Sequence, residues 1–544
     1  MQMKDIKEKN TGLLQPNNAS DVPHLDTTQK KEETGAIKTT QSLVVAFVLA
    51  MVFRGFVVEG FVIPTGSMAP TLLGQHLLKH SDQTGKYFPV GFATKRNIGP
   101  ERFVDPLLGR TMPLPTTEAK KIIPRSGDRV LVLKMLYPFF EPERFDVVVF
   151  KNPTDTQGLA ANYIKRLIGL PNETIWIADG EIFAKKGDGQ FAIQRKPEHV
   201  QKSIWSSVSN SDAIPTDKLA LPHPWQGPPW RALPEKDWNI DGRTWKCDGG
   251  EARLLWDNQK MPIDDWLSYN LLLSRRGQEQ EPMSDIRVGA TIIPQGNALV
   301  VGLELHAVGH IFEWSIAGSK VTLAKQLDGD PSSLTTLQFD IDPFRVGKPT
   351  RVEFWHVDQM LAMYIDNQRV GEMLYDYGPE ERLRLVTKSD KSVPIEEIAG
   401  RGGAAPKLSW HFKNAPFTMS RVSVDHDLYY RSDLLQSSAT KNPTMSGNEK
   451  LVEVGSPAFG THPDKLAVLG PNQFMMAGDN STYSSDGRLW GNPDEFVAAQ
   501  IDTAPFLVNR DLLIGKAWCV YWPSAFRLGN FPIIPDFGSV RFIR

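Results

Sequence analysis

The chain has 544 residues, and its 61 Lys and Arg residues against 63 Asp and Glu residues give a formal net charge of −2. This balance excludes a protein that binds nucleic acid through a general basic surplus or that stays disordered through a general acidic surplus. The length exceeds that of one ordinary domain, so we expect two or three domains. Only two cysteines are present, Cys247 and Cys519, and whether they pair stays open. No Cys/His cluster has zinc-ligand spacing, so we predict no structural metal.

The N-terminal residues 1–38 are polar and predict a disordered tail. Residues 39–60 contain the only long apolar run, Ser42–Phe53, which reaches the length of a bilayer-spanning helix when it is counted through Val58. A cleaved secretory signal is the alternative. It is disfavoured because the run starts far from the N-terminus and no small-residue cleavage site follows it.

We therefore predict an uncleaved, single-pass signal anchor over 39–60. Basic residues placed just before a spanning helix hold that end in the cytoplasm. They are Lys30, Lys31 and Lys38. The tail is then cytoplasmic and the rest of the chain is exported across the cytoplasmic membrane.

Short alternating strands dominate residues 61–185, apart from an irregular stretch over 73–126, and they return over 462–544. The predicted strands are Arg129–Lys134, Asp146–Phe150, Asn162–Leu170, Glu173–Ala178, Glu181–Ala184, Gln473–Ala477 and Asp511–Trp522. Asp179-Gly180 is typical of the turn of a two-residue hairpin. The pattern predicts a mainly β fold that is split by a long insertion.

The insertion begins with a Trp/Pro-rich segment over 186–284. Half of the 14 tryptophans lie in it: Trp205, Trp225, Trp230, Trp238, Trp245, Trp256 and Trp266. They could form an aromatic binding surface, but a loop-rich core is favoured because Trp is usually well buried.

Residues 285–435 alternate in short runs that are separated by turns, which predicts a two-sheet β-sandwich of jelly-roll type. The course of the hairpin over 351–365 resembles the laminin-G or concanavalin-like sandwiches. The resemblance is one of strands and turns, and it carries no sugar or calcium motif.

Ser67 is a candidate nucleophile. It lies on a turn with Pro and Gly, Phe61–Leu72, directly after the apolar run, and so next to a membrane. A serine needs a base within hydrogen-bond reach. His76 and His80 are close in sequence but are expected to be surface residues, and no Gly-x-Ser-x-Gly motif is present.

Lys165 is the candidate base, since it lies within the apolar strand Tyr163–Leu170. A lysine among bulky apolar neighbours loses solvent, and its pKa falls. On a strand, Lys165 shares a face with Tyr163 and Leu167. An exposed lysine on an edge strand is the alternative from this segment alone.

A polar loop over 478–488 follows the strand that ends at Ala477. Ser484 or Ser485 could orient a lysine amine. Asp486 and Arg488 are spaced for a local ion pair.

Together these segments resemble the type I signal peptidases, which are membrane-anchored serine peptidases with a Ser–Lys dyad. The resemblance rests on Ile63-Pro-Thr-Gly-Ser-Met-Ala-Pro-Thr-Leu72, on Tyr163-Ile-Lys-Arg-Leu-Ile-Gly-Leu-Pro171 and on Gly478-Asp-Asn-Ser-Thr-Tyr-Ser-Ser-Asp-Gly-Arg488. It does not cover the sandwich.

The resemblance implies a role for each matching residue. Ser67 is the nucleophile, Lys165 the general base, Ser484 the residue that orients the lysine, and Thr65 the second oxyanion donor beside the Ser67 N–H. Asp486 with Arg488, and Asp479 with Arg166, support the site. The chain departs from the pattern at Ser481, where many members carry Arg, and at Gly487, where many carry Ser.

The implied activity is that of a serine endopeptidase, without a cofactor, which removes signal peptides from exported preproteins at the outer face of the membrane. Its partners are preproteins with small residues before the cut, membrane lipid and the export machinery, and not nucleic acid. Two alternatives stay open: a membrane-anchored binding protein with a relic peptidase part, and a self-cleaving Ser–Lys protease. The role of the insertion is not implied.

Overall fold

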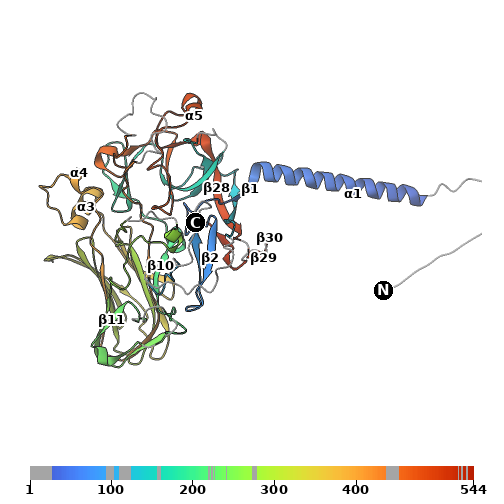
Figure 1. Cartoon of the computed structure of the whole chain (residues 1–544). Coiled ribbons are helices and arrows are strands. Elements are labelled where there is room, and N and C mark those ends of the chain that lie inside the picture. Colours follow the sequence, from blue (N-terminus) through green and yellow to red (C-terminus); the bar gives the residue numbers. More distant parts are fainter. Residues whose placement is uncertain are drawn as a thin grey trace, which may run out of the picture. The chain divides into compact units, whose positions relative to one another are not determined.

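The computed structural model describes residues 27–92, 103–109, 124–155, 161–218, 221, 225, 227–240, 242–272, 279–435, 453–524, 526–528, 531–534 and 537–544 (Figure 1). The chain forms two compact units, residues 1–57 and residues 58–544. Over the residues that the structure describes, the first unit is helical and the second consists mainly of strands, so the predicted mainly β fold with one N-terminal apolar helix is confirmed.

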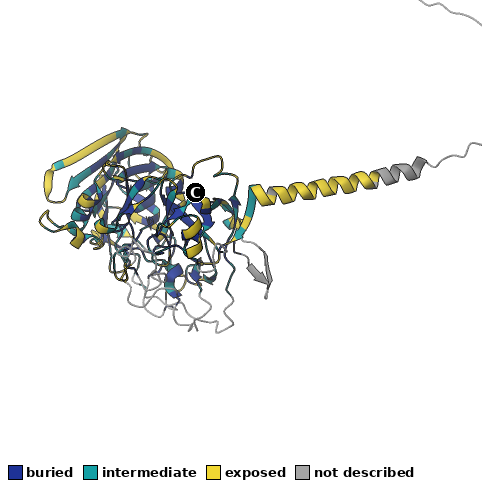
Figure 2. Cartoon of the chain, turned by 90° about the horizontal axis from the view of Figure 1, so that it is seen from above, coloured by how far each residue is buried: buried dark blue, intermediate teal, exposed yellow. Residues whose placement is uncertain are grey.

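The helix α1 (Thr27–Val52) continues into a π-helical turn, η1 (Phe53–Val57). Within them, Ile37–Val57 has 21 residues with a mean hydropathy of 1.8, which is long and apolar enough to cross a membrane. Its described side chains are exposed almost throughout (Figure 2). An apolar helix that finds no protein partner is typical of a membrane anchor.

The membrane-length span Ile37–Val57 lies within three residues of the predicted anchor 39–60 at each end, while the helix and the first strand extend differently. The helix begins at Thr27, inside the predicted tail, because Gln, Lys, Glu and Ala residues there are good helix formers that extend an existing helix at little cost. The part of the predicted tail before residue 27 lies outside the described residues. Strand β1 starts at Val58, before the predicted end of the anchor, because Val58 pairs with Leu133 of the sheet.

The main sheet of the second unit takes its strands from both ends of the chain, in the order β1-β4-β28-β5-β6-β26-β27, with β31 beside β28. Its strands are β1 (Val58–Val62), β4 (Arg129–Leu133), β5 (Val147–Lys151), β6 (Asn162–Gly169), β26 (Gln473–Ala477), β27 (Val508–Asn509), β28 (Leu513–Trp522) and β31 (Arg541–Phe542). We call this part, with the strands that flank it, the split domain. Its main sheet is complete only when the segments before and after the insertion pair with each other.

Smaller sheets complete the split domain. They are the four-stranded sheet β25-β7-β8-β9 and the hairpins β2–β3 and β29–β30. Their strands are β2 (His76–His80), β3 (Tyr87–Gly91), β7 (Glu173–Ala178), β8 (Glu181–Lys186), β9 (Ala192–Ile193), β25 (Ala467–Val468), β29 (Phe526–Leu528) and β30 (Phe531–Ile534). The predicted turn between β7 and β8 is present, and both Asp179 and Gly180 have positive φ, as a tight hairpin turn requires. Residues 73–126 are less irregular than predicted, since they hold β2 and β3.

The insertion folds into two antiparallel sheets. One has the order β12-β13-β24-β15-β20-β21-β22, with β10 beside β24, and the other has the order β11-β14-β23-β16-β17-β18-β19. The first sheet contains β10 (Ser206–Asn210), β12 (Trp238–Asn239), β13 (Thr244–Cys247), β15 (Ile286–Pro294), β20 (Thr350–Val357), β21 (Met360–Ile365), β22 (Gln368–Leu374) and β24 (Phe417–His426). The second contains β11 (Trp230–Leu233), β14 (Glu251–Trp256), β16 (Val300–Ala307), β17 (His310–Ala317), β18 (Lys320–Leu327), β19 (Asp330–Asp340) and β23 (Lys407–Lys413).

The Trp/Pro-rich segment is part of the sandwich, so the predicted boundary at 285 was wrong. Strands β10 and β13 pair with β24, and β14 pairs with β23, and both of these partners lie far later in the chain. Trp230, Trp245 and Trp256 are buried in the core between the sheets, as the favoured interpretation expected. Their strands β11, β13 and β14 have only four to six residues each, so each gives too short a run of alternation to stand out in the sequence.

Helices are few and short in the second unit. They are α2 (Glu198–Ile204), α3 (Pro379–Thr387), α4 (Ile395–Ile398) and α5 (Glu495–Gln500), with short 3-10 turns such as η4 (Ser268–Leu272). Helix η4 belongs to the insertion and contacts the split domain, as described below.

A buried charged cluster joins the sandwich to the β7–β8 hairpin of the split domain. Carboxylate oxygens of Glu181, Asp285 and Asp358 lie within 4.8 Å of one another. Arg382 lies 3.7 Å from Glu181 and 3.6 Å from Asp285, and Lys196 pairs with Asp358. Arg382 and Lys196 neutralise much of the acidic charge of this cluster. The cluster therefore connects the sandwich to the split domain through buried ion pairs.

Candidate active site

Ser67 lies on a tight turn just after β1. The Ala69 N–H donates to Gly66 O at 3.1 Å, and the Leu72 N–H donates to Met68 O at 2.9 Å. Met68 and Leu72 are fully buried in the core under the main sheet. These two apolar anchors fix the turn, and Ser67 itself is 7% exposed.

Lys165 lies on β6, opposite Val148 of β5, and its amine reaches the serine. Lys165 Nζ is 2.5 Å from Ser67 Oγ, although 98 residues separate them in the chain. Burial lowers the pKa of Lys165 to about 8, against the opposing pull of the Asp486 and Asp479 carboxylates. The alternative of an exposed edge-strand lysine was wrong, since Lys165 is 3% exposed.

The polar loop after β26 packs against both residues. Ser484 is buried and Ser485 is exposed, so only Ser484 faces the site. Its hydroxyl helps to hold the pKa of Asp486 low, after the larger contribution of Arg488. Among the described residues, Ser484 Oγ makes no hydrogen bond of normal geometry, and therefore none to Lys165. Its orienting role stays a prediction.

Two buried ion pairs hold this loop. Arg488 Nη2 lies 2.8 Å from Asp486 Oδ2. Arg166 binds Asp479 with two hydrogen bonds, of 2.8 Å and 2.7 Å, and both side chains are fully buried. Asp479 also accepts a hydrogen bond of 2.5 Å from the Thr71 hydroxyl, which ties the loop to the nucleophile's turn. Both predicted pairs are therefore formed.

Thr65 lies two residues before Ser67 and is exposed. Its hydroxyl makes no hydrogen bond to another described residue, which leaves it free to meet a substrate. Its role as an oxyanion donor stays a prediction.

His76 is buried, which corrects the expectation of a surface residue. Its Nδ1 lies 2.8 Å from Gly74 O and its Nε2 lies 3.2 Å from Ser524 Oγ. Both ring nitrogens are therefore engaged away from Ser67, and burial lowers the pKa of His76. Lys165 is the side chain whose amine contacts Ser67 Oγ.

Both departures from the family pattern have a local reason. Ser481 Oγ accepts hydrogen bonds from Arg488 Nη1 at 2.6 Å and from the Arg431 backbone N–H at 2.8 Å, so chain leaving the insertion packs on this position. A Cβ on Gly487 would lie 2.9 Å from Met476 O, which leaves little room for Ser.

Sequence reasoning missed Gly478 and Asn480, although both lie in the loop that it singled out. A Cβ on Gly478 would lie 2.1 Å from Ser484 Oγ and 2.5 Å from Ser67 O, so glycine permits the close approach. Asn480 Nδ2 donates to Gly66 O at 2.9 Å, and its backbone N–H donates to Ser67 O at 3.1 Å. The loop thus holds the peptides on both sides of the nucleophile.

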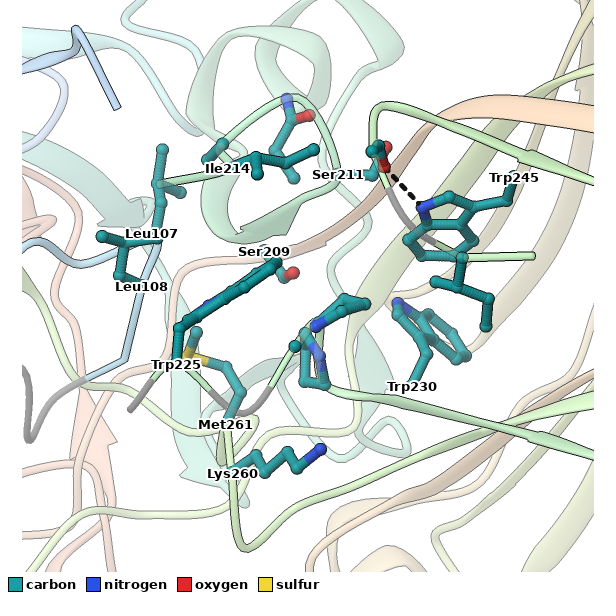
Figure 3. Close-up of a pocket in the computed structure, with 17 residues that line it drawn as sticks. Leu107, Leu108, Ser209, Ser211, Ile214, Trp225, Trp230, Trp245, Lys260 and Met261 are labelled. Carbon is teal, nitrogen blue, oxygen red and sulfur yellow. Dashed lines mark hydrogen bonds between the residues drawn. The ribbon is translucent and has the colours of Figure 1, made fainter. Parts of the chain in front are cut away.

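The tryptophans of the insertion form a separate pocket (Figure 3). Trp225, Trp230 and Trp245 line it with Ser209 and Ser211, and Trp245 Nε1 donates to Gly242 O at 3.1 Å. The cavity volume is about 40 Å³. Since about 10–15 Å³ holds one water, this pocket has room for only a few waters, and its lining residues include none of those around Ser67.

Part of the chain is similar to known signal peptidases. Residues 110–221, which include Lys165, match the family model "Signal peptidase, peptidase S26". Signal peptidase I of Rickettsia typhi is 31% identical over 135 residues, which cover 25% of this chain and 38% of the relative. Signal peptidase I of Pseudomonas fluorescens is 26% identical over 223 residues, which cover 40% of this chain and 61% of the relative. The chain therefore spans less than two thirds of each of these relatives.

Solved structures similar to the chain are β-sandwich proteins. A carbohydrate-binding module of family 66 from Bacillus subtilis covers 37% of the chain at 11% identity, with 97% of the module covered and a TM-score of 0.21. An endo-β-1,3-glucanase from Pyrococcus furiosus covers 36% at 10% identity, with 79% of the enzyme covered and a TM-score of 0.23. The sandwich assignment rests on the strand pairings given above. Over residues 110–221, the chain is similar to the signal peptidase S26 family.

Proposed function

We propose that the protein is a membrane-anchored signal peptidase I, a serine endopeptidase that removes signal peptides from exported preproteins. The observation that carries the proposal is the contact of 2.5 Å between Lys165 Nζ and Ser67 Oγ in a buried site where the pKa of Lys165 falls to about 8. A serine activated by a desolvated lysine is suited to acyl transfer at near-neutral pH.

The chemistry follows from these two groups. The neutral Lys165 amine takes the proton of Ser67 as Oγ forms a bond to the scissile carbonyl carbon. The Ser67 N–H and the Thr65 hydroxyl stabilise the oxyanion. Protonated Lys165 then gives its proton to the departing amine, which leaves an acyl-enzyme. Lys165, neutral again, accepts a proton from a water molecule that attacks the ester, and then returns it to Ser67 Oγ.

The buried ion pairs serve this chemistry by fixing the loop. Asp479 is engaged by Arg166 and Thr71, and Asp486 by Arg488. Burial, the larger effect, lowers the pKa of Lys165, and the charges of Asp486 and Asp479 raise it. These opposing effects on its pKa allow Lys165 both to accept a proton and to donate one.

The substrate is a preprotein whose signal peptide lies in the bilayer. Its cleavage region emerges in extended form and adds as a strand to the split domain, so that backbone hydrogen bonds supply affinity and shallow pockets select small side chains. The segment Ile37–Val57 anchors the enzyme beside it, with the N-terminal residues in the cytoplasm and residues 58–544 on the exported side.

The proposal is tested by the position of the cut. The purified full-length protein is mixed with a preprotein in lipid vesicles, and mass spectrometry of the products locates the cleaved bond. We expect one cut after a small residue, with loss of cleavage when that residue is changed to Phe, and no product from Ser67→Ala. Cleavage of the enzyme itself and of no preprotein would instead support a self-cleaving protease, and no cleavage at all would support a binding protein.

A further inference from the structure

Helix η4 of the insertion lies directly on the turn that carries the nucleophile. A Cβ on Gly66 would lie 2.1 Å from a ring carbon of Tyr269, so this ring fills the space where a side chain at position 66 would stand. Tyr269 is buried, and its hydroxyl donates to Gln75 O at 3.3 Å. Tyr269 of the insertion therefore contacts the split domain at Gly66 and at Gln75, which precede and follow Ser67 in the chain.

Asn270, the next residue of η4, pairs with Asn480 through both side-chain amides. Asn270 Nδ2 donates to Asn480 Oδ1 at 2.7 Å, and Asn480 Nδ2 donates to Asn270 Oδ1 at 2.7 Å. Asn270 Nδ2 also donates to Thr482 Oγ1 at 2.7 Å. Both asparagines are buried, and 210 residues separate them. This reciprocal pair fixes which atom of the Asn480 amide faces the nucleophile's turn.

The other N–H of Asn480 Nδ2 donates a hydrogen bond to Gly66 O, at 2.9 Å. Gly66 O and the Ser67 N–H belong to one peptide unit, which is planar and trans, so the two groups point in opposite directions. A hydrogen bond that fixes Gly66 O therefore also fixes the direction of the Ser67 N–H. That N–H is the backbone donor which the mechanism uses for the oxyanion.

From this chain of contacts we propose that the insertion completes the active site, with Asn270 as a positioning residue that acts through Asn480 on the Ser67 N–H. The inference rests on the proposed peptidase function. It gives the insertion a role inside the catalytic cycle, since an oxyanion donor stabilises charge only when its direction is set before the reaction. The insertion is then not a separable module, because its removal would release the amide that orients Asn480.

The test compares Asn270→Ala with Asn258→Ala in the full-length protein, using cleavage of one preprotein in vesicles. Asn258 is a matched control, because it lies in the same insertion and its Nδ2 donates to Pro406 O at 2.7 Å, away from Ser67. We expect Asn270→Ala to lower kcat tenfold or more with KM changed less than threefold, and Asn258→Ala to leave kcat within twofold. Asn270→Asp, which keeps the size but loses both donors, is expected to lower kcat in the same way and serves if the alanine variant does not fold.

A second measurement separates positioning from general damage. If Asn270 acts through Asn480, the double variant Asn270→Ala/Asn480→Ala has the kcat of Asn480→Ala alone, and the losses do not multiply. A folded Asn270→Ala or Asn270→Asp enzyme with wild-type kcat, or losses that multiply, would overturn the inference. A wild-type enzyme that cleaves no preprotein would instead refute the proposed function, so the two failures are distinguishable.

Discussion

Lys165 Nζ and Ser67 Oγ are 2.5 Å apart inside a site where both side chains are less than one tenth exposed. Burial removes the water that would stabilise a charged amine, and this is the main cause of the lowered pKa of Lys165. If Lys165 is the base, as proposed, the effect of its burial on its pKa should be measurable in the pH dependence of activity and of stability.

The first prediction concerns activity against pH. With a pKa of about 8 for Lys165, only the fraction of enzyme with a neutral amine reacts. We expect kcat/KM to rise about tenfold per pH unit below pH 8 and to level off above it. The measurement is the initial cleavage rate between pH 6 and pH 10 with one preprotein. A flat profile between pH 6 and pH 9 would assign the base to another group.

A second prediction concerns the stability cost of the buried lysine. Between pH 8 and its ordinary pKa of 10.5, the unfolded chain holds a proton that the folded enzyme has released, so folded stability rises with pH in that window. Lys165→Met removes this dependence. We expect the variant to raise the free energy of unfolding by about 1–3 kcal/mol at pH 7, and by less at pH 9.5. Urea unfolding at the two pH values checks this, and an equal gain at both would be contrary to it.

The buried pair of Arg166 and Asp479 should matter far more than an exposed pair. Asp479→Asn leaves the Arg166 guanidinium charged, buried and without its counter-ion, which typically costs about 3–5 kcal/mol. The matched control is Lys320→Ala on β18, whose pair with Asp340 is largely exposed and is expected to contribute about 0–1 kcal/mol. Denaturant unfolding of both variants decides the point. Equal and small losses would mean that Asp479 and Arg166 do not support the loop.

Thr65 can be tested without threatening the fold, since its side chain is exposed. Loss of one oxyanion donor costs about 2.7–4 kcal/mol of barrier. Thr65→Val should therefore lower kcat about a hundredfold or more with little change in KM, and Thr65→Ser should retain most of the activity because it keeps the hydroxyl. A Thr65→Val enzyme with the wild-type kcat would remove Thr65 from the mechanism.

The candidate site residues Ser67 and Lys165 could be predicted from the sequence, because each lies in a pattern that its neighbours in the chain form. Ser67 lies on a Pro/Gly turn after an apolar helix, Lys165 in an apolar strand, and Asp486 beside Arg488 in a polar loop. Strands with clear alternation, such as β7 and β20, could also be predicted from the sequence. These features depend on neighbours in the chain, which a sequence displays directly.

The contribution of the insertion could not be predicted. Asn270 is a single amide in a short 3-10 turn, and it meets Asn480 only because the chain folds back over 210 residues. Strands β10, β13 and β14 could not be predicted for a related reason, since their partners β23 and β24 come far later in the chain. Tertiary pairing of this kind leaves no periodic signal near the residues concerned.

The most direct test of the account is cleavage of one preprotein by four forms of the full-length enzyme: wild type, Ser67→Ala, Lys165→Ala and Lys186→Ala. Lys186 is exposed at the end of β8 and serves as the lysine control. We predict a processed product from the wild type and from Lys186→Ala, and product at background level from the two dyad variants, with all four forms folded. Processing by folded Lys165→Ala at the wild-type rate would contradict the Ser–Lys mechanism.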